Sequence, residues 1–230
     1  MPRGELKSEP IHETIVKLNA RIESRFPGSG LGEVGQTLLN LAAVNDEVIA
    51  KARRPIWWLR VLIACGVLAL LVTATWAAFQ MIRIATGESP SIPDLLQGVD
   101  AAVNEIILLG LALVFMTSME TRFKRRQSLS ILHRLRGLAH VVDMHQLTKD
   151  PEFSLRPDNS ASETEKPPLD RFQLERYLDY CSEMLALTSK LAALHLTATQ
   201  DPVVLSVINE IEALVTGLTR KIWQKIIILQ

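Results

Sequence analysis

Cysteine is scarce in this chain, which holds only Cys65 and Cys181 among its 230 residues. Cys65 stands inside a long apolar run and Cys181 in an amphipathic segment, so we do not expect the two thiols to pair. Small secreted domains that depend on disulfides carry several cysteine pairs. The cysteine content therefore excludes a disulfide framework.

Net charge is also absent, because 25 lysine and arginine residues balance 25 aspartate and glutamate residues. A chain without an overall positive field lacks the electrostatic signature of a nucleic-acid-binding protein. The one dense basic run, RFKRR at 122–126, directly follows an apolar segment. Basic residues in that position set membrane topology and contact anionic lipids, so we predict no nucleic-acid partner.

Strand-forming and catalytic patterns are missing as well. No stretch alternates apolar and polar residues as a half-buried strand does, and CxxC, nucleophile-elbow, zincin and Walker motifs are absent. The stretch GSGLGEVG at 28–35 lacks the Lys-Ser/Thr pair of a phosphate-binding loop, so it indicates a turn between helices. We predict an all-α protein with no enzymatic activity, no cofactor and no metal.

What the sequence does contain is a long apolar run. Residues 61–82 (VLIACGVLALLVTATWAAFQMI) carry no charge. As a helix they would reach about 33 Å, enough to cross a ~30 Å hydrocarbon core. Trp57, Trp58 and Trp76 stand near the two ends, where indole rings favour the membrane interface. The N-terminal residues lack a signal-peptide pattern, so we expect an internal, uncleaved signal anchor.

A second apolar segment at 106–119 is shorter, and about 21 Å of helix cannot span the core alone. Including Ala101–Glu105 extends the span to about 101–120 and ~28 Å, which brings Asn104 and Glu105 to its outer edge. Polar groups at that depth are costly unless hydrated or paired. These two residues form a candidate membrane-polar site. Glu105 is either a hydrated interfacial carboxylate or part of an ion path or ring across subunits.

Basic residues orient the two spans, because one lies in the loop between them and seven flank them on the other side. The loop residue is Arg83, and the flanking residues are Lys51, Arg53, Arg54, Arg122, Lys124, Arg125 and Arg126. The positive-inside rule places both termini in the cytoplasm and the loop 83–100 outside. We expect a multi-pass protein of a cell membrane, of the bacterial inner-membrane type.

Amphipathic helices are predicted on both flanks of this hairpin, over 8–26, 33–53, 122–146, 170–196 and from Asp201 to the C-terminus. The last helix has a coiled-coil-like apolar stripe, broken at Lys225, that needs a partner helix in the same chain or in another subunit. The stripe comprises Val204, Ile208, Ile211, Val215, Leu218, Ile222 and Leu229.

The chain is therefore expected to fold as an integral membrane, two-span helical hairpin with a cytosolic helical bundle formed by both flanks. The segments are N-terminal cytosolic helices at 1–54, the transmembrane hairpin at 55–121 with spans at about 57–82 and 101–120, a cytosolic extension of the second span at 122–149, a flexible linker at 150–169 and a C-terminal helical pair at 170–230. The linker is assigned because it is rich in proline, serine and acidic residues.

A polar cluster on the segment 122–146 is a candidate cytosolic site. Its members share one helical face and are His133, Arg136, His140 and Asp143. The two histidines lie two turns, or about 10.5 Å, apart, too far to bind one metal directly. We interpret the cluster as a solvated or inter-helix polar face, with an anion, lipid-headgroup or partner site as the alternative.

Small residues recur every four positions in the first span, at Cys65, Ala69, Thr73 and Ala77. Such a stripe allows close approach of another helix. That helix is either the second span of the same chain or a span of another subunit.

Two functions fit this organisation. In the first, a non-enzymatic two-span membrane protein uses its cytosolic module for self-association and for interaction with a partner protein or signal. In the second, several hairpins assemble into a pore gated by the cytosolic part, with Glu105 ringing its outer mouth. Both make the lipid bilayer and further copies of the chain partners of this protein.

Overall fold

The structure is a computed structural model that describes residues 6–54, 57–86, 92–149 and 169–229. Of these residues 92% are helical, and none of them forms a β-strand, which confirms the predicted all-α class. The chain divides into two units. The bundle comprises Met1–Arg53 and Arg125–Gln230, and the apolar unit comprises Arg54–Lys124.

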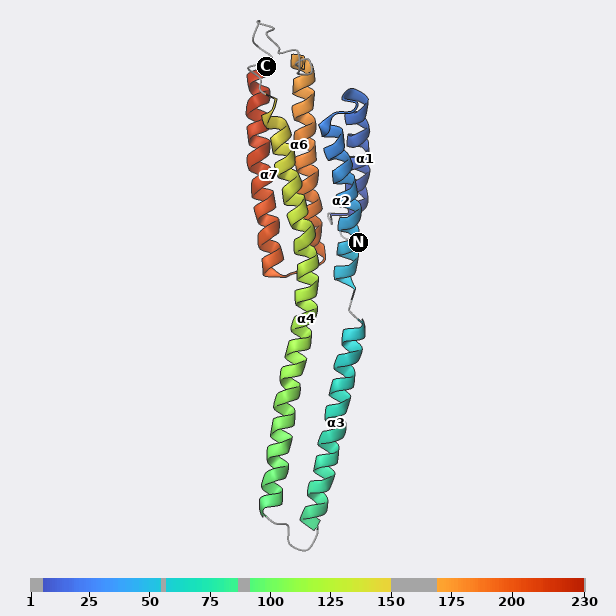
Figure 1. The fold of residues 1–230 in the computed structure, drawn as a ribbon, viewed down its shortest axis with the longest axis vertical. Helices are drawn as coiled ribbons and strands as arrows, with labels where there is room; N and C mark the ends of the chain where they lie inside the picture. The colour runs from blue at the N-terminus through green and yellow to red at the C-terminus, as the bar shows by residue number, and fades with distance from the viewer. Residues whose placement is uncertain (1–5, 55–56, 87–91, 150–168, 230) are drawn as a thin grey trace. The chain divides into compact units, whose positions relative to one another are not determined.

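The elements follow the sequence in simple order (Figure 1). They are α1 (Ser8–Arg25), α2 (Gly30–Arg53), α3 (Trp57–Thr86), α4 (Ile92–Leu147), α6 (Arg171–Ala193), the 3-10 helix η1 (Leu194–Thr197) and α7 (Pro202–Leu229). Helix α4 belongs to the apolar unit up to Lys124 and to the bundle from Arg125 onward.

The glycine-rich stretch at 28–35 is a turn followed by the start of α2. Gly28 has a φ of +62°, a left-handed conformation that glycine adopts without steric cost. Gly30 opens α2 so close to α4 that a Cβ atom there would lie 2.6 Å from the His145 ring. Gly28 therefore serves the turn, and Gly30 allows the close packing of α2 against α4.

Local sequence also fixes where the last two long helices begin. Asp170 precedes α6 in a capping box, in which its backbone N–H donates to Gln173 Oε1 at 3.2 Å. Asp201 precedes α7, whose first residue is Pro202, the residue type best suited to that position. Both starts fall where the residue pattern predicts a helix to begin.

The core of the bundle is made of the apolar stripes of α1, α2, α4, α6 and α7. Burying a side chain of the size of leucine or isoleucine contributes roughly 1.5–3 kcal/mol. The stripes, rather than polar contacts, therefore hold the bundle together. Fully buried members include Ile15, Leu18, Ile22, Leu38, Leu132, Leu135, Leu178, Leu185, Ile208, Ile211 and Ile222.

Side-chain contacts show how α4 and α7 run relative to each other. Arg136 of α4 pairs with Glu210 of α7 at 3.3 Å, and further along both helices Lys225 Nζ donates to the Gln146 carbonyl at 2.8 Å. Residue numbers rise together on the two helices, so α4 and α7 run parallel. The apolar stripe of α7 thus has its partner helices in the same chain.

Lys225, which interrupts that stripe, has a specific role in the bundle. Its ammonium donates to the carbonyls of Gln146, at 2.8 Å, and Lys149, at 3.4 Å. The last carbonyls of a helix lack partners within the helix and carry partial negative charge. Lys225 therefore caps the C-terminal end of α4.

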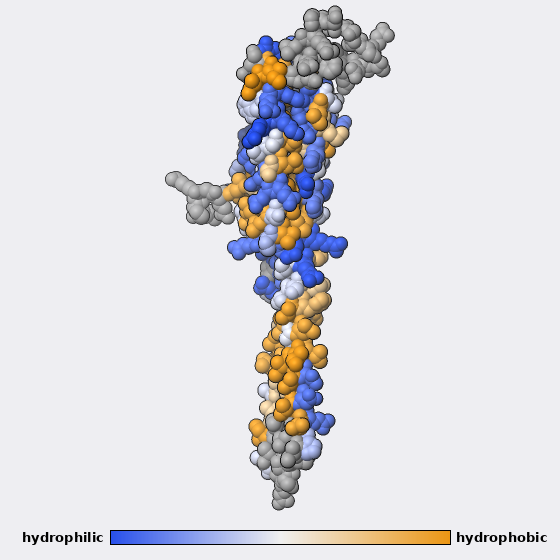
Figure 2. Space-filling view, turned by 90° about the vertical axis from the view of Figure 1, so that its left-hand side faces the viewer, coloured by the Kyte–Doolittle hydropathy of each residue, from blue (hydrophilic) through white to orange (hydrophobic). Residues whose placement is uncertain are grey.

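Three described helices, α3, α4 and α7, are long and apolar enough to cross a membrane by length and composition. Composition alone therefore leaves the predicted two-span hairpin open, because α7 is a third candidate. Their surroundings differ: no residue in the most apolar window of α3 or α4 is buried, against 28% of the residues in the window of α7. Figure 2 shows apolar side chains over much of the visible face of the apolar unit.

The helices of the apolar unit extend further than the sequence pattern suggests. Much of the expected outer loop 83–100 is helical, since α3 continues to Thr86 and α4 begins at Ile92. Pro93 lies in the first turn of α4, where a missing N–H costs nothing. The remainder of that loop, 87–91, and the predicted linker from 150 to 168 lie outside the described residues.

Candidate functional site

A buried polar pair joins α2 to η1. His195 Nε2 lies 2.9 Å from Asn45 Oδ1, and Asn45 Nδ2 donates to the Leu191 carbonyl at 3.2 Å. Both side chains are 0% exposed. Buried polar groups cost free energy unless they are paired. The pair therefore favours one alignment of α2 against the end of α6.

The hydrogen bonds show which imidazole nitrogen of His195 carries the proton. Because the Asn45 amide nitrogen donates to a carbonyl, its Oδ1 is the acceptor and His195 Nε2 is the donor. His195 Nδ1 is buried and has no hydrogen-bond partner in the described part of the chain. Burial lowers the pKa of His195 to about 4, so the imidazole is neutral at neutral pH.

A buried imidazole with so low a pKa is poorly matched to acid–base catalysis near pH 7. Its setting resembles that of a polar contact that fixes helix register inside an apolar core. The pair therefore affects the packing of the helices rather than a reaction. Protonation of His195 would place a charge next to an apolar core and would oppose the packing of α2 against η1.

Two signals in the sequence point to this pair. Asn45 occupies a position on the apolar stripe of α2 between Leu41 and Ile49. His195 stands between Leu194 and Leu196 at the end of an apolar run. A polar residue on a buried stripe needs a partner, and the partner here lies 150 residues away in sequence.

Two arginines that stand next to the apolar unit in the sequence contact residues close to His195. Arg53, the last residue of α2, donates from Nη2 to Thr197 Oγ1 at 2.6 Å. Arg125, the first bundle residue after the apolar unit, donates from Nε to Asp201 Oδ2 at 2.7 Å. The six residues, which we call the junction cluster, are Asn45, Arg53, Arg125, His195, Thr197 and Asp201.

Asp201 is the anionic member of the cluster, and its side chain is only 6% exposed. Burial alone would raise the pKa of this carboxyl, but hydrogen bonds from Arg125 and from the backbone N–H groups of Val204 and Val203 hold the pKa below its usual value. Charge-assisted bonds of this kind are roughly twice as strong as neutral ones. Asp201 therefore caps α7 and anchors it to α4.

The predicted polar face on α4 is present in the bundle but is not a closed site. His133, Arg136 and His140 are exposed, and Arg136 pairs with Glu210. Asp143 is half-buried and accepts a hydrogen bond from Gln146 Nε2 at 2.6 Å. No group of three or more His, Cys, Asp or Glu side chains within the described ranges is placed to hold a metal ion. A function for this face stays a prediction.

In the apolar unit, Asn104 is exposed and Glu105 is half-buried on α4. The small-residue stripe of α3 is mostly exposed, since Cys65, Ala69 and Thr73 are exposed and Ala77 is half-buried. Contact of this stripe with another helix stays a prediction, and exposure within one chain leaves it accessible to another subunit.

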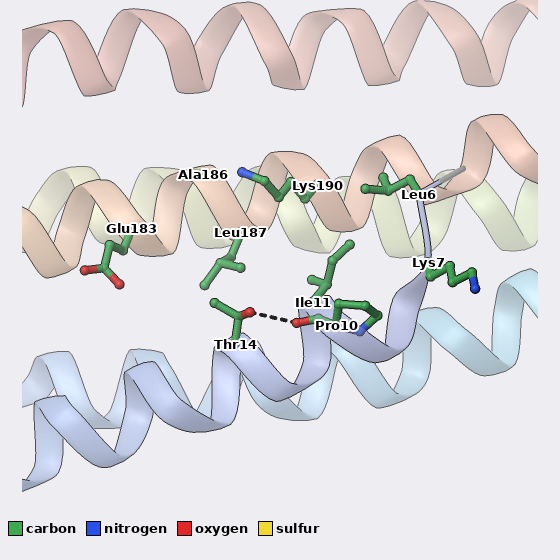
Figure 3. Close-up of a pocket in the computed structure, with 9 residues that line it drawn as sticks. All are labelled: Leu6, Lys7, Pro10, Ile11, Thr14, Glu183, Ala186, Leu187 and Lys190. Carbon is green, nitrogen blue, oxygen red and sulfur yellow. Dashed lines mark hydrogen bonds between the residues drawn. The ribbon is translucent and has the colours of Figure 1, made fainter. Parts of the chain in front are cut away.

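A groove of about 570 Å³ runs between α1 and α6 (Figure 3). Its floor is apolar and includes Ile11 and Leu187, and Lys7 and Lys190 stand at its edge. Inside it, Thr14 Oγ1 donates to the Pro10 carbonyl of its own helix at 2.7 Å. Glu183 also lines the groove but already pairs with Arg21. The described lining therefore shows no set of polar groups that converge to orient a small ligand.

Comparison with known protein families, with curated proteins and with solved structures finds no match for this chain.

Proposed function

We propose that this chain is a non-enzymatic, two-span membrane protein whose cytosolic bundle mediates self-association and interaction with a partner protein or signal. One observation carries the proposal: the bundle buries its own apolar stripes, whereas the most apolar windows of α3 and α4 are entirely unburied. Exposed apolar helices of that length are stable in lipid, where the backbone satisfies its own hydrogen bonds.

Helix α7 is assigned to the bundle rather than to the membrane. Its stripe, including Ile208 and Ile211, is buried against the other bundle helices. Its outer face carries exposed Glu210, Glu212 and Arg220. A charged side chain at the centre of a bilayer costs about 2.5–3.5 kcal/mol. Two spans therefore account better for the three apolar helices than three spans do.

The basic residues supply the orientation. Lys51, Arg53 and Arg54 stand before α3, and the RFKRR run stands at the other end of the apolar segment of α4. Positive residues stay on the cytoplasmic side. The bundle and both termini then lie in the cytoplasm, in a cell membrane of the bacterial inner-membrane type.

The junction cluster supports a signalling role for the bundle. Arg53 and Arg125 are the bundle residues on either side of the apolar unit, and both contact the segment that joins α6 to α7. A displacement of either connection would therefore act on the α6–α7 hairpin. The same contacts would carry an effect of partner binding back toward the spans.

Labelling of single cysteines checks the orientation. In a Cys65→Ala background, Thr86→Cys should react with a membrane-impermeant maleimide added to intact cells, and Ser130→Cys should react only after lysis. Cys181 can stay, because burial raises the pKa of its thiol to about 12 and keeps it unreactive. Labelling of Ser130→Cys but not Thr86→Cys in intact cells would contradict the topology.

The number of copies tests the function itself. For this chain in nanodiscs we expect a mass of two copies and no current after reconstitution into planar bilayers. Few spans rarely enclose a water path, so an interaction protein and a pore differ in this measurement. Five or more copies, or a cation current that falls in Glu105→Gln, would overturn the proposal in favour of a pore.

A further inference from the structure

A groove of about 520 Å³ follows one face of α4 within the apolar unit. Apart from Ser118, its walls are apolar and come from residues about one turn apart, among them Leu108, Leu111, Phe115 and Met119. At one end stands Arg122, which is the one charged side chain among the described residues that line the groove. An apolar groove that ends at a cation is complementary to an amphipathic anion.

The basic residues of the run 122–126 differ in their contacts. Lys124 pairs with Glu120 at 2.8 Å, and Arg125 pairs with Asp201 at 2.7 Å. Arg122 is exposed and forms no ion pair within the described residues. Arg126 is exposed too, but it does not line the groove. Arg122 is thus the cation available at the groove.

The dimensions match one lipid leaflet. From Arg122 to Ala112 the helix rises about 15 Å, which is half of a ~30 Å hydrocarbon core. With Arg122 at the level of the headgroups, an acyl chain that follows the groove would pass Met119 and Phe115 and end near the middle of the bilayer.

We propose that this groove binds one anionic phospholipid of the cytoplasmic leaflet, with its phosphate at Arg122 and an acyl chain along α4. The inference rests on the proposed membrane anchoring. A second copy of the chain is a poorer occupant, because a two-fold contact on this face would bring the two Arg122 guanidinium groups together. Like charges that meet in this way oppose association.

Native mass spectrometry of the detergent-solubilised full chain tests the site. Dioleoyl phosphatidylglycerol and dioleoyl phosphatidylcholine have the same acyl chains and differ in headgroup charge. Wild type should bind the anionic lipid more tightly. Arg122→Gln should reduce this preference about fivefold. Arg134→Gln, which removes an exposed arginine of α4 outside the groove, should leave it unchanged. Ala112→Trp, which fills the groove, should weaken binding of both lipids.

An unchanged preference in Arg122→Gln, or an equal loss in Arg134→Gln, would overturn the inference. So would a loss of dimer in Ala112→Trp with lipid binding intact, because the face would then lie between copies. Extraction of the wild type from membranes by alkaline carbonate would instead refute the anchoring. Retention in the membrane without a headgroup preference would refute the lipid site alone.

Discussion

Ile211→Asp is expected to unfold the bundle. Ile211 is 0% exposed and lies at the centre of the α7 stripe, so the substitution buries a carboxylate among apolar side chains. A carboxylate there must stay unpaired, take up a proton or undock the helix, and each outcome costs on the order of 3–5 kcal/mol. Domains have only about 5–15 kcal/mol of stability in total. Circular dichroism during thermal unfolding of the full chain in detergent should show loss or a large downward shift of the bundle transition.

Ala213→Asp is the matched control, because it adds the same charge two residues away at an exposed position of the same helix. It should change the midpoint little. Membrane insertion of Ile211→Asp should persist, because the residue belongs to the bundle and not to the apolar unit. An unchanged midpoint in Ile211→Asp would show that the stripe is not buried.

Acidification is expected to destabilise the bundle through His195. Burial lowers the pKa of His195 to about 4 in the folded chain, against about 6.5 in an unfolded chain. The unfolded chain therefore binds the proton first. The contribution of the neutral imidazole is complete above about pH 6.5 and is lost as the pH falls toward 4. The loss amounts to about 3 kcal/mol.

Urea unfolding at pH 7.5 and pH 4.5 measures this dependence. His195→Gln, whose side chain does not titrate, should lose much less stability between these two pH values than wild type does. His133→Gln removes an exposed histidine of α4 and should behave like wild type. Burial raises the pKa of Asp46 and Asp179, which acts in the opposite direction but is shared by all three proteins. Equal pH dependence in wild type and His195→Gln would contradict the prediction.

The sequence was sufficient for the helical class because each buried stripe repeats with the period of a helix over many residues. Ile15, Ile22, Leu135 and Ile211 all lie on such stripes and are all buried in the core. The start of α7 could also be predicted, since Asp201-Pro202 is a local signal for the beginning of a helix. Composition does not settle the number of spans: the sequence pattern predicts two, whereas α3, α4 and α7 are all long and apolar enough to cross a membrane.

The junction cluster was hidden for a different reason. Asn45 and His195 each interrupt an apolar stretch, but they lie 150 residues apart in sequence and no local pattern links one to the other. His133 and His140 stand out in the sequence instead, because their regular spacing lies along one helix, but both are exposed. Local periodicity identifies which face is buried, and it does not tell which residue of another helix will meet a polar side chain there.

The distance in sequence between contacting residues also determines when their contacts can form during translation. Helices α1 and α2 are made first, yet their polar contacts to α6 and η1 join residues 144–162 positions apart. At about 5–20 residues per second, translation takes roughly 7–30 s to supply those partners. During that interval the apolar faces of α1 and α2 have no α6 or α7 to cover them. We expect the nascent N-terminal pair to depend on chaperones, and truncation before α6 to leave an aggregation-prone fragment.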